Sequence, residues 1–288
     1  MTISSRETPR PEDLKRRISV VVCARNEAAR IADCLASVVA NAPDEIIVVD
    51  GNSEDDTVAI AGRYTDHIVV SENSNLTRDR QIGIDATGNS LIAMIDADHR
   101  LKPDDLESLK KDIYAFNLDI VQAAIDIAPN SFWCRAEGEA LDLVQNSPGE
   151  KGMIGVAPAL FKRHVFKHVR FDDTITRTID DTDFMYRLSR TGCCAIGTGE
   201  TRITQSHFGE FASYLQKFRW YGKGDGEFCI KHPERAGSMI FHLAVRYPLL
   251  HAGRALLHGK PRAFVYFILQ GTVRFGSAIW TLARRPRG

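Results

Sequence analysis

Residues 91–98 read LIAMIDAD, five apolar residues followed at once by Asp96, Ala97 and Asp98. A short apolar run of this kind is typical of a strand that is buried on both faces of a sheet. On an extended backbone alternate side chains point the same way, so the two carboxylates would lie on one side of the chain. Oxygen ligands of this type suit Mg²⁺ or Mn²⁺. The stretch therefore predicts a strand that ends in a divalent metal site, although a lone Asp-x-Asp is more often a capped turn.

Three similar strands precede this one along the chain, at residues 18–23 (ISVVVC), 45–50 (EIIVVD) and 67–71 (HIVVS). Apolar residues at helical spacing follow the first strand, and further helices are expected over 78–86 and 103–116. This alternation with short links predicts right-handed βαβ units around a mostly parallel sheet flanked by helices, an α/β fold. Ligands bind at the carboxyl ends of the strands in such sheets. Polar clusters at residues 23–26, 50–53 and 96–98 are therefore expected to meet at one edge.

A second group of carboxylates, Asp180, Asp181 and Asp183, follows a less regular stretch of the chain. Like charges this close raise one another's pKa, which lets one carboxylate act as a base near neutral pH. The alternative is an acidic first turn that interacts favourably with a helix dipole. His207, after an apparent strand at 201–204, is by itself more often a structural residue than a ligand.

Gln216, Arg219 and Trp220 would share one face of a helix, because they follow the i, i+3, i+4 spacing. Arg219 suits a phosphate group, and Trp220 could stack on a sugar. The end of an ordinary amphipathic helix would look the same.

Charge is unevenly distributed along the 288 residues. Residues 235–288 contain nine Lys or Arg and no Asp or Glu, so the rest of this neutral chain carries a net charge of −9. A basic, apolar tail predicts an anionic lipid surface as partner rather than nucleic acid. The six cysteines show no metal-ligand spacing, and Cys193 and Cys194 are adjacent, which favours reduced thiols in the cytoplasm.

The tail contains two apolar stretches, at residues 241–257 and 263–283. Arg274 interrupts the second, and the uninterrupted run 263–273 is too short to span a bilayer. We expect two amphipathic helices that lie on the inner face of the cell membrane. The alternative is a helical pair packed on the α/β domain, for example at a homodimer interface. Residues 1–17 are polar, unlike a secretory signal, and are expected to form a flexible leader.

Taken in order, these motifs resemble the family 2 glycosyltransferases of GT-A fold, over about residues 18–227. The resemblance rests on seven elements of the sequence: ARNE at 24–27, VDGNS at 49–53, RQIG at 80–83 with Gly88, DAD at 96–98, FD at 171–172, DDxD at 180–183 and QxxRW at 216–220. Each element is weak alone, but seven in the expected order are hard to produce by chance.

The resemblance implies inverting transfer of a sugar from a nucleoside diphosphate donor, with a role for each motif. Asp98 would bind the metal with support from Asp96 and His207, and Asp181 would be the base, with Asp180 beside it. The acceptor and diphosphate end would be formed by Gln216, Arg219 and Trp220. The donor would contact Ala24, Asn26, Glu27, Asp50, Asn52, Arg80, Asp96 and Ala97.

The sequence departs from the family pattern at three positions. Gly51 replaces an acid that contacts the nucleobase in many members, Gln81 replaces the usual Asn, and Asp180 replaces the commoner Glu. The motif at 216–220 is associated with processive synthases that carry several long transmembrane helices. This chain lacks such helices, so single-sugar transfer is expected.

The sequence thus predicts a GT-A catalytic domain at 18–235, with a donor half (18–118) and an acceptor half (119–235), and a helical appendage at 236–288. The expected activity is metal-dependent transfer of one sugar, from a UDP-sugar first of all, to a lipid-linked or cell-surface glycan. A catalytically degenerate scaffold is the alternative. A sugar-nucleotide-forming nucleotidyltransferase is less favoured, because residues 23–27 do not resemble its Gly-rich loop.

Overall fold

The computed structural model describes residues 15–175, 179–207 and 209–284. The chain forms two units, which we call the sheet unit and the helical unit. The sheet unit lies within residues 1–126, 146–176 and 180–206, and the helical unit within 127–145, 177–179 and 207–288. Most of the expected leader lies outside the described residues.

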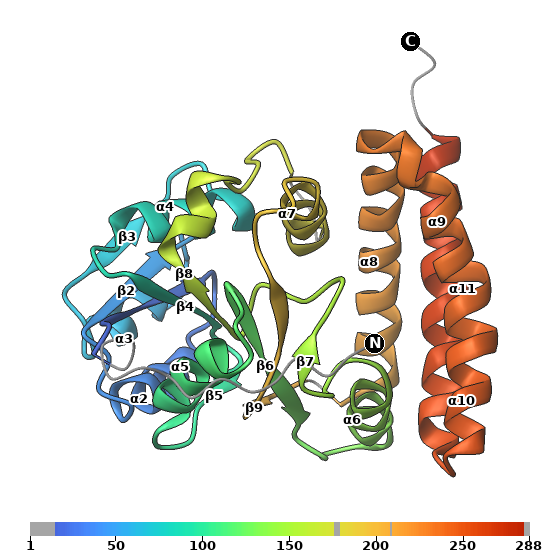
Figure 1. The fold of residues 1–288 in the computed structure, drawn as a ribbon, viewed down its shortest axis with the longest axis horizontal. Helices are drawn as coiled ribbons and strands as arrows, with labels where there is room; N and C mark the ends of the chain where they lie inside the picture. The colour runs from blue at the N-terminus through green and yellow to red at the C-terminus, as the bar shows by residue number, and fades with distance from the viewer. Residues whose placement is uncertain (1–14, 176–178, 208, 285–288) are drawn as a thin grey trace. The chain divides into compact units, whose positions relative to one another are not determined.

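The first four strands of the sheet unit are parallel, in the order β3-β2-β1-β4. Helices connect them, which gives the expected βαβ units (Figure 1). The elements are β1 (Ile18–Ala24), α2 (Ile31–Val39), β2 (Glu45–Asp50), α3 (Thr57–Ala61), β3 (Ile68–Val70), α4 (Leu76–Ala86) and β4 (Leu91–Asp96).

Beyond β4 the sheet continues with strands that include several antiparallel pairs, so the sheet as a whole is mixed. The order continues β8-β6-β9-β5, and β7 pairs with β9. The remaining elements of the unit are β5 (His99–Arg100), α5 (Asp105–Ala115), β6 (Ile120–Ile127), β7 (Gly149–Glu150), β8 (Ala159–Lys162), η1 (Arg163–Lys167), α7 (Asp180–Ser189) and β9 (Ile196–Gln205).

Apolar strand residues build the core on both faces of the sheet. Along β1, Val20 and Val22 pack into one cluster with α2 and α5, whereas Val21 packs into the other with α7. This explains why the strands read as continuous apolar runs. Helix α5 begins at Asp105 rather than at Pro103, because Asp104 adopts a left-handed conformation with φ of 68°.

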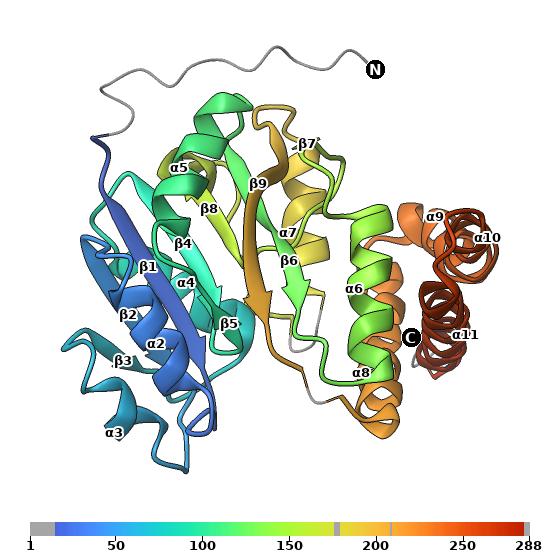
Figure 2. The ribbon, with the colours of Figure 1, turned by 90° about the horizontal axis from the view of Figure 1, so that it is seen from below.

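The helical unit consists of α6 (Phe132–Val144), α8 (Phe211–Lys231), η2 (Pro233–Arg235), α9 (Ala236–Phe241), a π-helical segment η3 (His242–His251), α10 (Ala252–Leu257) and α11 (Pro261–Ala283). Helices α8 and α11 lie side by side (Figures 1 and 2). Gly222 permits this approach, since a Cβ atom there would lie 2.4 Å from the Arg274 carbonyl oxygen. The structure thus groups α6 and α8 with the tail helices, whereas the sequence suggested a boundary near residue 235.

Arg274, which interrupts the apolar run of the tail, has a partner within the helical unit. Its guanidinium donates to both carboxylate oxygens of Asp225 on α8, at 2.9 and 2.8 Å. Among the described residues no helix has both the length and the apolar run that crossing a bilayer needs. Large apolar side chains nevertheless stay exposed on the tail, including Phe241, Leu249, Leu250, Leu256 and Leu257.

Candidate active site

The ends of β1, β2 and β4 meet at the carboxyl edge of the parallel strands. In register, Asp50 lies beside Ala24, and Asp96 lies beside Cys23. The two acids therefore flank the end of the central strand β1, as the sequence predicted for this edge. Open sheets of this kind bind ligands at this position.

The loops after β1 and β2 hold one another in place. Both carboxylate oxygens of Asp50 accept hydrogen bonds from Ser53, whose hydroxyl also accepts from the Asn26 backbone at 2.9 Å. Asn26 and Asn52 have positive φ values of 54° and 59°, a conformation that Asn tolerates better than most residues. Glu27 accepts two hydrogen bonds from Arg30. The expected donor residues within 24–27 and 50–52 therefore lie at two interlocked turns.

Asp96, Asp98 and His99 form a group whose ligand atoms all lie within 4.8 Å of one another. Ala97 between the acids is buried, and Asp98 Oδ2 accepts a hydrogen bond from Gln205 at 3.0 Å. Asp98 Oδ1 is buried and has no hydrogen-bond partner among the described residues. An unsatisfied buried carboxylate oxygen is costly unless a cation or another donor meets it. The residues present therefore fit a divalent ion held by Asp96 and Asp98.

The sequence motifs did not indicate that His99 belongs to this group, although it directly follows Asp98. Its Nδ1 accepts a hydrogen bond from the Asp96 backbone N–H at 3.0 Å, so in the neutral ring the proton is on Nε2. Nε2 lies 3.8 Å from Asp98 Oδ1 and has no hydrogen-bond partner in the described part of the chain. A protonated Nε2 cannot bind a metal ion. In this tautomer His99 is therefore bonded to the Asp96 backbone and is not placed to act as a ligand.

Arg80 joins the motif at residues 96–98 to the second group of carboxylates. Its guanidinium, on α4, lies 3.2 Å from Asp96 Oδ1 and 2.5 Å from Asp180 Oδ2 on α7. Burial disfavours the charge of Arg80, but Asp180 and Asp96 outweigh that effect and raise its pKa. The sequence predicted both groups of carboxylates. It did not predict the ion pairs with Arg80 that connect them.

Asp181 sits beside this pair, in the first turn of α7. Burial, and then the neighbouring Asp180 carboxylate, raise the pKa of Asp181 to about 6. Its Oδ1 accepts hydrogen bonds from the backbone and hydroxyl of Thr182, at 2.6 and 3.2 Å. A carboxylate with this pKa can accept a proton at neutral pH better than an ordinary aspartate can.

His207 and the motif at 216–220 belong to the helical unit. His207 Nε2 lies 3.5 Å from Glu137 and 3.3 Å from Lys217. The metal-ligand group found among the described residues at the sheet edge does not include this histidine, so its metal role stays a prediction. Gln216, Arg219 and Trp220 lie on the helix α8 and are all exposed, whereas the buried residues of α8 include Tyr214 and Phe218.

The comparisons with known proteins identify the family and the fold. The family model described as "Glycosyl transferase family 2" matches residues 19–169, more than half of the chain. The chain belongs to glycosyl transferase family 2. It is therefore a glycosyltransferase with the GT-A fold, as the sequence motifs implied. No curated protein matches the chain.

Solved structures share the fold of this glycosyltransferase at low sequence identity. A mannosyltransferase from Pyrobaculum calidifontis, in complex with GDP-Man and Mn²⁺, has a TM-score of 0.62 and 17% identity, with 94% of this chain and 88% of that chain covered. TarS 1–349 from S. aureus, in complex with UDP-GlcNAc, has a TM-score of 0.56 and 13% identity, with 92% and 89% covered. Such identities establish the fold alone.

Proposed function

We propose that this glycosyltransferase moves one sugar, with inversion, from a nucleoside diphosphate donor to a hydroxyl of a lipid-linked or cell-surface glycan. A UDP-sugar is the first donor to test, and Mn²⁺ or Mg²⁺ is the proposed cofactor. The observation that carries the proposal is the set of carboxylates around Arg80 at the sheet edge. There Asp96 and Asp98 fit a cation, and Asp181 has a pKa suited to a base. The GDP-Man, UDP-GlcNAc and Mn²⁺ in the similar structures support the ligand classes.

In the proposed reaction the acceptor oxygen attacks the anomeric carbon as the bond to the donor phosphate breaks. The acceptor proton passes to Asp181, and the electron pair of the broken bond leaves with the nucleoside diphosphate. Asp180 stays paired with Arg80, and its carboxylate raises the pKa of the neighbouring Asp181, which strengthens Asp181 as a base. When bound, a divalent ion at Asp96 and Asp98 would offset the charge of the leaving diphosphate.

The residues for the donor and the acceptor follow the sequence motifs. We assign the nucleotide-sugar to the turns that contain Asn26 and Asp50, and the diphosphate or acceptor to the exposed face of α8 with Gln216, Arg219 and Trp220. An arginine can bind a phosphate in bidentate fashion, and an exposed tryptophan can stack on a sugar ring. His207 remains a candidate for the metal shell.

A panel of nucleotide-sugars with Mn²⁺, scored by donor hydrolysis and by thermal shift, tests this function. One UDP- or GDP-sugar should be hydrolysed slowly and should raise the melting temperature only when the metal is present. If no donor binds, the degenerate scaffold becomes the better account. Formation of a nucleotide-sugar from a sugar phosphate would instead support the nucleotidyltransferase.

We also propose that the tail attaches the enzyme to the inner, anionic face of the cell membrane. Exposed Leu249, Leu250, Leu256 and Leu257 on η3 and α10 lie among the exposed Arg246 and Arg254, the combination that binds anionic lipid surfaces. Replacing the four leucines by serine should abolish co-sedimentation with vesicles containing an anionic lipid. If the substitutions instead turned a dimer into a monomer in the absence of lipid, the same surface would be a homodimer interface.

A further inference from the structure

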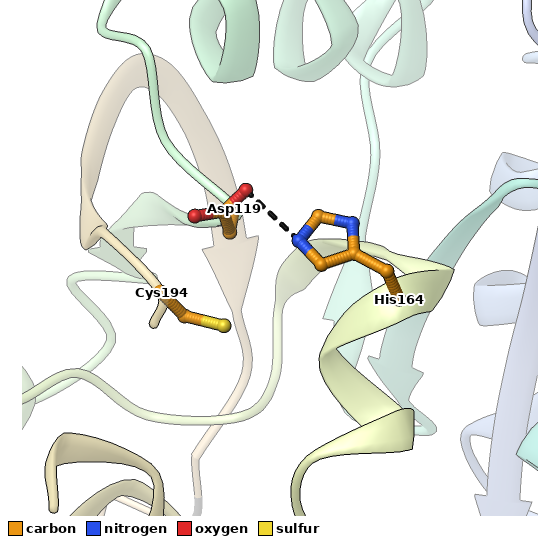
Figure 3. A group of neighbouring side chains, drawn as sticks. All are labelled: Asp119, His164 and Cys194. Atoms are coloured by element: carbon orange, nitrogen blue, oxygen red, sulfur yellow. Dashed lines mark ion pairs between the residues drawn. The ribbon is translucent and has the colours of Figure 1, made fainter. Parts of the chain in front are cut away.

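We propose that Asp119, His164 and Cys194 bind one divalent transition-metal ion of the zinc class, at a site separate from the candidate active site. Figure 3 shows the three side chains turned toward one another. One ligand atom from each lies within 4.8 Å of the other two. This inference does not depend on the transfer reaction, since none of the three residues belongs to the motifs assigned to it.

The fold brings these residues together from three distant parts of the sequence. Asp119 directly precedes β6, His164 lies on η1 after β8, and Cys194 precedes β9. The backbone N–H groups of Asp119 and Ala195 fix the two strand starts, through hydrogen bonds of 2.7 Å to the Ala195 carbonyl and 2.9 Å to Asp119 Oδ2. Cys194 is therefore held beside Asp119 by the backbone of the sheet.

The cluster lies at the edge of the sheet opposite the candidate active site. Strand β8 is antiparallel to both β4 and β6, so β6 runs parallel to β4. Asp119 precedes the start of β6, whereas Asp96 ends β4. The two sites are thus separated by the length of the strands, and an ion here would not contact a donor bound at the carboxyl edge.

The three ligands differ in a way that selects the metal. Thiolate, imidazole and carboxylate together suit Zn²⁺, whereas Mg²⁺ and Ca²⁺ prefer oxygen ligands alone. His164 Nε2 lies 3.2 Å from Asp119 Oδ1, a separation that two ligands of one zinc ion can have. On binding, the Cys194 thiol loses its proton to solvent as the bond from sulfur to the metal forms. Since His164 is exposed, water could supply a further ligand to a bound ion.

Two neighbouring groups make the proposal specific. Lys162 Nζ lies 3.5 Å from Asp119 Oδ1, so its positive charge competes with a metal ion for that oxygen. Cys193 Sγ lies 3.4 Å from Cys194 Sγ and 2.8 Å from the Thr191 hydroxyl, but it is not part of the group of ligand atoms. A metal ion at this site should therefore require Cys194 but not Cys193, and should bind more tightly when Lys162 is neutralised.

Titration of the reduced, metal-free full-length protein with Co²⁺ tests the site. Bound Co²⁺ should give a thiolate-to-metal charge-transfer absorption that excess Zn²⁺ removes. Cys194→Ser should abolish this absorption, and His164→Ala should weaken Co²⁺ binding at least about tenfold. Lys162→Met should tighten binding several-fold, a change that damage to the fold would not produce.

The matched controls are Cys193→Ser and His168→Ala, because His168 is exposed one turn after His164 without belonging to the group. Both should bind Co²⁺ like the wild type. The proposal is overturned if the wild type shows no charge-transfer band. A band that survives in Cys194→Ser, or that is lost in Cys193→Ser, would overturn it too.

Discussion

Arg80 Nη1 donates a hydrogen bond to Asp180 Oδ2 at 2.5 Å, and this contact joins α4 to α7 across 100 residues of sequence. Both side chains are almost fully buried. The same guanidinium lies 3.2 Å from Asp96, so the Arg80 side chain connects the proposed donor motif to the proposed base region.

Removal of Arg80 should therefore damage both stability and activity. Arg80→Ala leaves Asp180 buried without its partner, and breaking a buried pair from one side costs about 3–5 kcal/mol. Urea unfolding should show that loss. Arg78→Ala, at an exposed position of the same helix, is the control and should stay within about 0.5 kcal/mol of the wild type. Equal effects of the two substitutions would contradict the bridging role.

The pH dependence of kcat/KM should show an acid limb with an apparent pKa of about 6, because Asp181 must be deprotonated to act as the base. Asp181→Asn should lower kcat by about 10²–10⁴-fold. Asp180→Asn removes the negative charge that raises the pKa of Asp181. The positive charge of Arg80, which lowers that pKa, is then no longer offset by Asp180, so the pKa of Asp181 should fall. The acid limb of that variant should move to lower pH. An unchanged limb would assign the titration to another group.

Glu137 provides a test of the helical unit. Burial opposes its ionisation, but Lys217 and His207 lower its pKa to about 2, and the hydroxyls of Tyr214 and Tyr266 also donate to it. A folded pKa below the unfolded value stabilises the protein above the unfolded pKa, and this contribution disappears as the pH falls through the folded pKa.

The depression from 4.5 to about 2 corresponds to on the order of 3 kcal/mol. Glu137→Gln should therefore lose stability at neutral pH, and its free energy of unfolding should change less than that of the wild type between pH 5 and pH 2. Parallel pH profiles of the two proteins would show that Glu137 is not paired in this way.

The packing of α8 on α11 should be sensitive to a single methyl group. Gly222→Ala places a Cβ atom against the Arg274 carbonyl oxygen and should destabilise the protein by about 1–3 kcal/mol. Gly276 on α11 is exposed, and a Cβ there meets nothing within 4 Å, so Gly276→Ala should instead stabilise by about 1 kcal/mol. Thermal unfolding should show a lower melting temperature for Gly222→Ala and a higher one for Gly276→Ala than for the wild type. Equal effects would mean that α8 and α11 do not pack closely.

The sequence predicted the parallel half of the sheet well, because β1, β2 and β4 are short apolar runs that end in polar turns. It did not predict α6, β6 or β8, because the apolar residues in that stretch follow neither a clear helical nor a clear strand period. The role of Arg80 was also missed, since its partners Asp96 and Asp180 meet only in the folded chain. The sequence around Gly222 did not show why a glycine is needed there either. The reason is the close approach of α11, a helix that begins at Pro261.

Donor binding by wild-type protein and by Asp98→Ala, with and without Mn²⁺, tests the central claim most directly. Asp98 Oδ1 is a buried oxygen without a hydrogen-bond partner among the described residues and belongs to the candidate metal group, so its loss should remove the metal-dependent part of donor binding. Asp104→Asn, at an exposed position nearby, is the matched control. In calorimetry with the donor selected from the panel, Mn²⁺ should strengthen binding to the wild type and to Asp104→Asn by at least about tenfold, and should not affect Asp98→Ala. Equal metal-dependent binding by Asp98→Ala would contradict the account.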